Sequence, residues 1–279
     1  MAKRYQPVFL AIVLLSLPFV VVAGKPQQAG TRTSPTEIKS QDLRAGGNQN
    51  MRYFLIGPKA KAPAGGYALL VVMPGGGGGA DFHGFVKSIL RDALSDQYLV
   101  AQLVSVKWTP KQVIIWPTAM SNVEGQKFAT EQFVEAVIKD VAAKEKVDSK
   151  RIFTLSWSSS GPAAYAISLQ EKTAVTGSFV AMSVFKPNYL PALAAAKGRA
   201  YYIYHSPQDK VCPFRMAENA RDALTEAGAK VKFATYAGGH GWSSGDPLGD
   251  IRAGVDWLEK QAAADTGKPG ASTESSPAK

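Results

Sequence analysis

The feature that most constrains the fold is a continuous apolar run, Tyr67–Met73 (YALLVVM), which ends at Pro74 and five glycines. A strand that is apolar on both faces must be covered on both faces, which is typical of the parallel sheets of α/β proteins. Other short runs rich in β-branched and aromatic residues alternate with longer amphipathic stretches. The alternation predicts an α/β fold with a doubly wound, mostly parallel sheet flanked by helices, a three-layer sandwich.

The other expected elements follow from the same patterns. Further strands are predicted over residues 51–56, 98–106, 151–157, 175–184, 200–205 and 230–236. Helices are predicted over residues 82–94, 130–146, about 161–170, 214–227 and 251–263. The chain has 279 residues, of which 46% are hydrophobic, and it contains no internal repeat. This is enough apolar material for one large core, so a single domain is expected.

The N-terminal segment has the pattern of a signal peptide. Lys3 and Arg4 precede an apolar run over residues 7–23 that ends in Val21-Val22-Ala23. The small residues at its end favour cleavage after Ala23, so residues 1–23 are predicted to be removed and the protein to be periplasmic or extracellular. No stable membrane span is expected after cleavage. An uncleaved membrane anchor is the alternative, although the run is short for a span of about 20 residues.

Two further segments are predicted to lie outside the folded domain. Residues 24–50 are rich in Gln, Gly, Thr, Ser and Lys, and residues 265–279 read DTGKPGASTESSPAK. Both compositions lack the large apolar residues that a core needs, which indicates a disordered linker and a disordered tail. The predicted folded domain therefore spans residues 51–264.

Composition excludes several kinds of site. Cys212 is the single cysteine, so no internal disulfide can form, and three histidines leave little for a dedicated zinc site. We expect no metal and no cofactor. The net charge of +10 comes from Lys and Arg scattered along the chain, without the dense basic run of a nucleic-acid groove. No nucleic-acid partner is expected, although the charge can favour anionic substrates or surfaces.

Ser158 is the predicted nucleophile. It lies in the stretch SWSSSG, residues 156–161, at the expected step from a strand to a helix. A nucleophile there needs a tight turn with small residues two positions to either side, and Ser158 has Ser156 and Ser160 in those places.

The other serines of this stretch fit less well. Ser159 would have a tryptophan two positions away, and Ser160 would have a proline. Choosing Ser156 would place Pro162 deep in the helix, at a cost of about 3 kcal/mol or more. With Ser158, the proline falls in the first turn, where it is tolerated. The alternative is that these serines only cap a helix.

Asp209 and His240 are the predicted acid and base. Asp209 follows the strand over residues 200–205, and His240 follows the last strand in the glycine-flanked segment AGGHGW. The order nucleophile, acid, base and the location beyond the carboxyl ends of strands are those of a catalytic triad on an open α/β sheet. An aspartate in a turn can also be a simple cap. In that case Asp246, in the loop after His240, is the first alternative acid.

The glycine run after the first apolar strand is predicted to form the oxyanion hole. Glycine lets backbone N–H groups turn toward a substrate, and we assign the hole to the amides of Gly76 and Ser159. A phosphate-binding loop is disfavoured because no Lys-Ser/Thr pair follows the run. Aromatic residues next to strand ends are candidates for the substrate pocket, although such residues are often plain core. The candidate pocket residues are Trp116, Trp157, His83, Phe185 and Trp242.

Four motifs together resemble a known superfamily over residues 51–263. They are VVMPGGGGG, LSWSSSGPAAYA, HSPQDKVCPF and GGHGW. In this order they resemble the α/β-hydrolases, in the branch of dienelactone-hydrolase-like, phospholipase/carboxylesterase-like and polyhydroxyalkanoate-depolymerase-like esterases. The resemblance implies the α/β-hydrolase fold and a serine esterase that cleaves a small or polymeric carboxylic ester through an acyl-enzyme on Ser158. Two departures bear on the substrate class: Pro74 stands where many relatives have His, and Ser replaces Gly on both sides of the nucleophile.

Two other functions remain open at this point. A peptidase of the prolyl-oligopeptidase type uses the same order of triad residues. The irregular turn around Ser158 also leaves open a catalytically silent protein of the hydrolase fold that binds a ligand or partner.

The N-terminal pattern generates a prediction about location. Protein purified from its native host should begin at Gly24, because signal peptidase cleaves after small residues such as Ala23. N-terminal sequencing measures this directly. An intact Met1 on protein recovered from the cytoplasm would contradict it.

Overall fold

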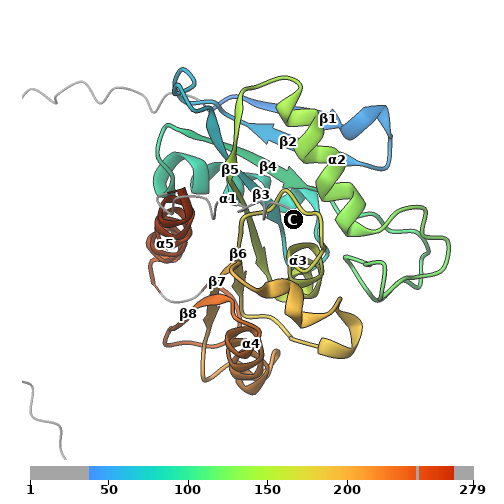
Figure 1. Ribbon diagram of the computed structural model, residues 1–279. Helices are drawn as coiled ribbons and strands as arrows, with labels where there is room; N and C mark the ends of the chain where they lie inside the picture. The colour runs from blue at the N-terminus through green and yellow to red at the C-terminus, as the bar shows by residue number, and fades with distance from the viewer. Residues whose placement is uncertain (1–37, 243–244, 267–279) are drawn as a thin grey trace, which may run out of the picture. The chain divides into compact units, whose positions relative to one another are not determined.

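The computed structural model describes residues 38–242 and 245–266 (Figure 1). Its sheet has eight strands in the order β1-β2-β4-β3-β5-β6-β7-β8. β2 is antiparallel to β1 and β4, and all other neighbours are parallel. The strands are β1 (Ser40–Arg44), β2 (Arg52–Ile56), β3 (Tyr67–Met73), β4 (Tyr98–Leu103), β5 (Val147–Trp157), β6 (Gly177–Ala181), β7 (Ala200–His205) and β8 (Lys230–Thr235).

Helices cover both faces of this sheet, which confirms the predicted doubly wound α/β class. The helices are α1 (His83–Ser88), α2 (Thr130–Ala142), α3 (Gly161–Ser168), α4 (Phe214–Glu226) and α5 (Pro247–Thr266). α2, α3 and α4 pack on one face, and α1 and α5 pack on the other. Figure 1 shows α5 on one side of the sheet, with α2 and α3 on the opposite side.

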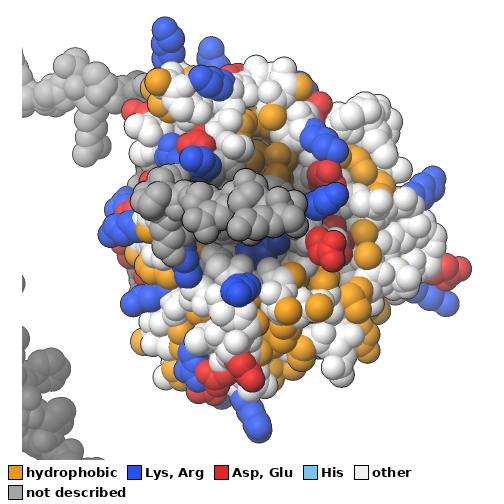
Figure 2. All heavy atoms as spheres, viewed as in Figure 1, with side chains coloured by type: hydrophobic (Ala, Val, Ile, Leu, Met, Phe, Trp, Pro, Cys, Tyr) orange, Lys and Arg blue, Asp and Glu red, His pale blue; other side chains and the backbone are white. Residues whose placement is uncertain are grey.

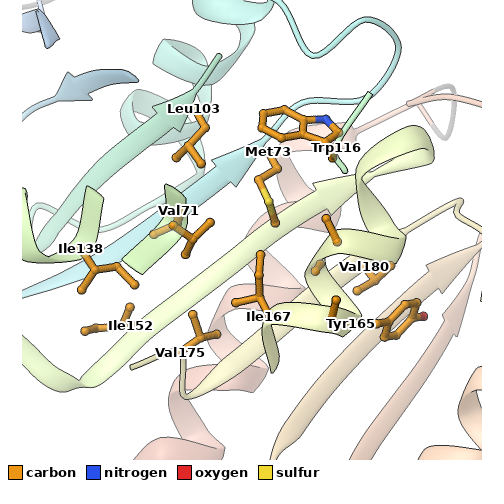
Figure 3. Close-up of a cluster of buried hydrophobic side chains, with 14 of the residues drawn as sticks. Val71, Met73, Leu103, Trp116, Ile138, Ile152, Tyr165, Ile167, Val175 and Val180 are labelled. Atoms are coloured by element: carbon orange, nitrogen blue, oxygen red, sulfur yellow. The ribbon is translucent and has the colours of Figure 1, made fainter. Parts of the chain in front are cut away.

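The central strand β3 divides the core into two layers. All seven of its residues are buried. Leu69, Val71 and Met73 face the layer under α2 and α3, whereas Leu70 and Val72 face the layer under α1 and α5. Figure 3 shows the first layer, with Val71, Met73 and Trp116 among the side chains that fill it. Burial on both faces explains why this strand reads as a continuous apolar run rather than as an alternating one.

The expected start of the domain at residue 51 is corrected by the structure. Residues 40–44 form β1, which pairs antiparallel with β2, and Ala45–Gly47 form a 3₁₀ turn with Ala45 fully buried. The second part of the predicted linker therefore belongs to the sheet. β1 is short and polar (SQDLR) and lies at the sheet edge, so neither its apolar content nor its length predicts a strand. At the other end, α5 extends to Thr266. Residues 1–23, the predicted signal peptide, and most of the predicted tail lie outside the described residues.

Several element boundaries also differ from those expected. The helix predicted over residues 82–94 is divided into the 3₁₀ turn Ala80–Phe82, α1 and the π-helical turn Ile89–Ala93. β5 begins four residues before its predicted start because Val147 pairs with Tyr67 across a register shift. The segment between β4 and α2, residues 104–129, has neither helix nor strand. These differences leave the strand ends that carry Ser158, Asp209 and His240 at the same edge of the sheet.

The surface in view carries no continuous basic belt. In Figure 2 the Lys and Arg side chains lie scattered among hydrophobic, acidic and uncharged ones. Within the described ranges, no helix combines the length and the apolar character needed to cross a membrane.

Candidate active site

Ser158 sits at a sharp turn between β5 and α3. Its φ is 55°, in the left-handed region that residues other than glycine seldom adopt. The backbone is extended at Trp157, makes one 3₁₀ turn over Ser158–Ser160 and then enters α3. Pro162 is in the first turn of that helix, as the choice of Ser158 requires. This strained strand-to-helix step is the geometry of a nucleophile elbow, which lifts a side chain above the sheet.

The neighbouring serines serve the turn itself. Ser160 is fully buried, and its hydroxyl lies 2.6 Å from the Met73 carbonyl while accepting the Trp157 amide at 3.0 Å. Ser156 is also fully buried and donates to the Phe179 carbonyl at 3.3 Å. Ser158 is only partly buried. Among these three serines, Ser158 is therefore the one that a substrate can reach.

The glycine loop after β3 packs directly against this turn. A Cβ at Gly75 would lie 2.5 Å from the Trp157 ring and 2.6 Å from its carbonyl oxygen, so only glycine permits this approach. The Ser159 hydroxyl donates to the Gly76 carbonyl at 2.8 Å and joins the loop to the elbow. Each carbonyl from Pro74 to Gly79 accepts a hydrogen bond. Because the N–H of a planar peptide points opposite to its C=O, fixing the carbonyls also fixes the direction of the amides.

Ser158, His240 and Asp209 form a continuous hydrogen-bonded chain. Ser158 Oγ lies 2.9 Å from His240 Nε2, and His240 Nδ1 lies 2.8 Å from Asp209 Oδ2. A carboxylate oxygen only accepts here, so Nδ1 carries the proton and Nε2 is free to accept the serine hydroxyl. The structure thus brings together the three residues that the sequence proposed. Asp246, the alternative acid, caps α5 through the Gly249 amide at 2.9 Å.

Asp209 is a fully buried carboxylate with several donors around it. Its Oδ1 accepts the amides of Val211 and Cys212, each at 2.8 Å. Burial alone would raise the pKa of Asp209. The His240 hydrogen bond and the two amides outweigh burial, so the pKa is lowered from its usual value. Asp209 therefore stays ionised, as a group that orients an imidazole must.

The loop that carries His240 is held by a tyrosine. The Tyr236 hydroxyl lies 3.0 Å from the Gly239 carbonyl and 3.1 Å from the Gly241 carbonyl, on either side of His240. The Ser206 hydroxyl also contacts the Gly238 carbonyl, which links this loop to the Asp209 loop. The histidine side chain itself is 21% exposed. A glycine-rich loop is thereby given one fixed position while its histidine remains accessible.

Sequence reasoning missed a second histidine beside the carboxylate. His205 ends β7 and is completely buried, with Nε2 at 2.9 Å from the Cys212 carbonyl and 3.2 Å from Asp209 Oδ2. Ser183 was missed as well: its hydroxyl lies 2.5 Å from the Ser158 carbonyl, and it fills the space that a Cβ at Gly161 would need. The position of His205 four residues before Asp209 was the available sequence signal.

The five aromatic and histidine candidates for the pocket are placed differently from one another. Trp157 and Trp242 lie together, with ring centroids 5.9 Å apart, in the layer under α1 and α5. Trp116 and Phe185 are buried in the layer under α2 and α3, where Trp116 donates to the Pro74 carbonyl at 2.9 Å. His83 bonds to Gln102 and Ser40 in the β1–β4 part of the sheet. The structure therefore brings together only Trp157 and Trp242.

A small cavity adjoins the glycine loop. Its volume is about 140 Å³, and Ser105 in its wall donates to the Gly77 carbonyl at 2.6 Å. The lining comes from the loop after β4 and from one glycine: Gly77, Ser105, Val106, Lys107, Gln112 and Ile115. A larger hollow of about 670 Å³ lies between residues 119–132 and Gln170. None of the three triad residues lines either hollow. The smaller one is lined by Gly77 of the glycine loop, which makes it the better candidate for substrate.

Among the residues that the structure describes, one group of side chains could supply metal ligands. Asp209, Cys212 and His240 each offer one ligand atom, and these atoms lie within 4.8 Å of one another. Two of the three are already hydrogen bonded to each other. Burial raises the pKa of the Cys212 thiol to about 11, so the thiolate form that binds metals is disfavoured. The expectation of a metal-free and cofactor-free site stays a prediction.

Comparison with known proteins identifies the fold. No protein-family model and no curated protein matches the chain. An alpha/beta hydrolase enzyme from a Medee basin deep-sea metagenome library matches with 15% identity and a TM-score of 0.58, over 81% of this chain and 98% of that one. The chain has the α/β-hydrolase fold. Esterase 2 of Thermogutta terrifontis, phosphonylated by cyclosarin, matches with 14% identity and a TM-score of 0.57, over 83% and 96% of the two chains.

The same α/β-hydrolase fold also occurs in a neighbour of another class. A candidate dipeptidyl aminopeptidase IV from Bacteroides ovatus matches with 15% identity and a TM-score of 0.56, over 80% of this chain and 36% of that one. Esterases and a peptidase thus share this architecture at similar identity. The chemistry must be argued from the site rather than from the fold.

The elbow generates a stability prediction. Ser160→Ala should lower the free energy of unfolding by about 1–3 kcal/mol, because it leaves a buried amide and a buried carbonyl without their partner. Urea denaturation followed by circular dichroism measures this. Ser149→Ala, at an exposed serine of β5, the strand that leads into this turn, is the matched control and should stay within about 0.5 kcal/mol of the wild type. Equal stabilities of the two variants would show that the Ser160 hydroxyl does not hold the turn.

Proposed function

We propose that this chain is an exported serine hydrolase that cleaves carboxylic esters through an acyl-enzyme on Ser158. The observation that carries the proposal is the hydrogen-bonded chain from Ser158 through His240 to Asp209, with the serine raised on a strained elbow. A serine hydroxyl is a weak nucleophile until a base removes its proton. Here an imidazole nitrogen of His240, oriented through Asp209, lies 2.9 Å from the hydroxyl oxygen.

In the first half of the reaction Ser158 Oγ attacks the ester carbonyl carbon. His240 Nε2 takes the serine proton as the new C–O bond forms, and Asp209 stabilises the imidazolium without itself taking a proton. His240 then returns that proton to the alkoxide, which leaves as an alcohol. In the second half a water molecule attacks the acyl carbon with His240 again accepting a proton, and Ser158 leaves with its hydroxyl restored.

The developing oxyanion is assigned to the amides of Gly76 and Ser159. Ser159 is in the first turn of a helical segment, where N–H groups have no partner within the helix. The Ser159–Gly76 hydrogen bond supports this assignment because it holds both arms of the hole in one place. Preorganised donors of this kind stabilise the transition state without reorganisation, and one such donor is worth about 10²–10³ in turnover.

The small cavity beside Gly77 supports a preference for small groups. A volume of about 140 Å³ matches the size of a short acyl or alcohol chain. We therefore expect short-chain esters to be the better substrates. Cleavage of amides by a peptidase of the same fold is the second candidate, favoured only by the Bacteroides ovatus neighbour.

The nucleophile can be tested with a fluorophosphonate probe. The wild type should become covalently labelled on Ser158, and Ser158→Ala should lose both labelling and ester turnover, because the Ser158 hydroxyl is the one that lies 2.9 Å from His240 Nε2. Mass mapping of the labelled peptide identifies the residue. Ser156→Ala is the matched control, since this serine is buried two residues away, and it should still be labelled.

The substrate class can be tested with the wild type and with Ser158→Ala. p-Nitrophenyl esters of increasing acyl length and aminoacyl anilides should be compared under one set of conditions. Turnover confined to short esters supports the proposal. Faster turnover of anilides would favour the peptidase, and a folded wild type without labelling or turnover would favour the silent binding protein.

The relation between base and acid gives a second prediction. His240→Ala should remove nearly all triad-dependent rate, and adding Asp209→Ala should cost little more, because Asp209 acts through His240. kcat/KM of both single variants and the double variant on one soluble ester tests this, with folding checked for each. Losses that multiply in the double variant would mean that the two residues act independently.

A further inference from the structure

The strongest unused feature of the molecule is the buried histidine behind Asp209. His205 shares no contact with Ser158, yet its ring is completely buried at the end of β7 and lies against the carboxylate. Asp209 Oδ2 therefore has two histidine nitrogens beside it, His240 Nδ1 at 2.8 Å and His205 Nε2 at 3.2 Å. The mechanism described for Ser158, His240 and Asp209 gives no role to His205, although its ring is buried beside the carboxylate.

The tautomer of His205 follows from its partners. Nε2 lies 2.9 Å from the Cys212 backbone carbonyl, which can only accept, so Nε2 carries the proton. Asp209 Oδ2 lies 3.2 Å from the same nitrogen. Within residues 38–242 and 245–266, Nδ1 is buried and has no hydrogen-bond partner. A proton on Nδ1 would leave a buried N–H without an acceptor, so the ring is neutral.

The surroundings keep His205 in this state. Burial lowers its pKa, against the opposing influence of the Cys212 carbonyl and Asp209. The titratable groups that face this cluster are Asp209 and Cys212 of the loop after β7, His240 of the loop after β8, and Tyr236 at the end of β8. α4 contributes only the Phe214 ring, edge-on at 5.9 Å. Asp250 of α5 is close enough to Tyr236 to contribute to the raised pKa of that hydroxyl.

We propose that His205 is a positioning residue for Asp209. Its single N–H ties the Asp209 carboxylate to the Cys212 carbonyl and so fixes both the loop after β7 and the direction of Oδ2. The carboxylate then accepts three hydrogen bonds, from two amides on Oδ1 and from His240 on Oδ2, and the His205 N–H edge lies against Oδ2 as a fourth polar contact. His205 stays neutral throughout the reaction and exchanges no proton with substrate. This inference rests on the proposed function, because positioning is argued for a carboxylate that orients a catalytic base.

A variant without the N–H should change the pH profile. Hydrolysis slows at low pH as the His240 imidazole becomes protonated, which gives the acid limb of kcat/KM. In His205→Phe, Asp209 loses the contact with this N–H, and more of its negative charge acts on His240. Protonated His240 is then favoured, so the acid limb should move to higher pH. Turnover should fall about tenfold, by analogy with outer hydrogen-bond partners of metal-bound histidines. KM should not change, since His205 does not touch substrate.

Two further variants separate positioning from simple destabilisation. His205→Gln retains an N–H near the position of Nε2 and should restore most of the turnover and the wild-type acid limb. Tyr201→Phe is the matched control: Tyr201 is fully buried on the same strand and bonds to Ser168, away from the site. It should lower stability without moving the limb. A wild-type limb and full kcat in His205→Phe, or equal losses in the Gln and Phe variants, would overturn the proposal.

Histidine NMR provides a readout that does not need activity. The chain has only three histidines, so the ring nitrogens of tag-free, full-length protein can be assigned by substitution. Wild-type His205 should be a neutral Nε2–H tautomer at neutral pH, because burial lowers its pKa. The protonation midpoint of the His240 ring should move to higher pH in His205→Phe.

The NMR result separates the two hypotheses. An Nδ1–H tautomer, or a protonated His205 at neutral pH, overturns the positioning role. If the wild type shows neither ester turnover nor labelling while the His240 midpoint responds to His205, the proposed function fails and the positioning role stands.

Discussion

The rest of the site depends on one strained residue, Ser158, held at a φ of 55°. Such a backbone persists only where its surroundings determine it from several sides. Here the Ser160 hydroxyl bonds to the Met73 carbonyl of β3 and to the Trp157 amide. Ser183 donates to the Ser158 carbonyl, and Gly75 allows the loop after β3 to pack closely against Trp157. The two positions that flank the elbow are serines rather than the usual glycines. At Ser160 the serine supplies a hydroxyl that bonds both to β3 and to β5, so this side chain stabilises the turn.

A second constraint is the buried charge of Asp209. Taking a carboxylate out of water is costly unless hydrogen bonds replace the water, and three hydrogen bonds and the contact with His205 do so here. The same contacts fix its orientation, so solvation and positioning have one structural cause. The loop after β7 can supply two of the hydrogen bonds because its backbone turns back on the carboxylate. The third comes from His240 in the loop after β8, and His205 at the end of β7 contacts the same oxygen, so the carboxylate connects these two elements.

Much of the fold could be predicted from sequence, because the signals are local or periodic. The continuous apolar run of β3 and the order of Ser158, Asp209 and His240 were sufficient for the architecture and for the residues that meet at the sheet edge. β1 was missed because an edge strand of polar residues carries no burial signal. His205 was missed because its importance depends on the loop folding back over it, which is a tertiary fact. The split of the helix after β3 into 3₁₀, α and π turns likewise depends on packing rather than on the sequence period.

The aromatic candidates for the pocket illustrate a limit of reasoning from strand ends. Side chains alternate between the two faces of a strand. The last residue of a strand therefore still points into one of the two layers of helices, like the residues before it. Trp157 follows Phe153 and Leu155 into the layer under α1 and α5. At the end of β5 it is the sharp turn at Ser158 that directs a side chain away from both layers, toward the edge of the sheet where the triad lies. Walls for a substrate must then come from segments that leave the sheet altogether. The loop after β4 is the longest of these at this edge, and it lines the cavity beside Gly77. Substrate selectivity in this molecule is therefore expected to reside in residues 104–115, apart from the strand ends that supply the triad.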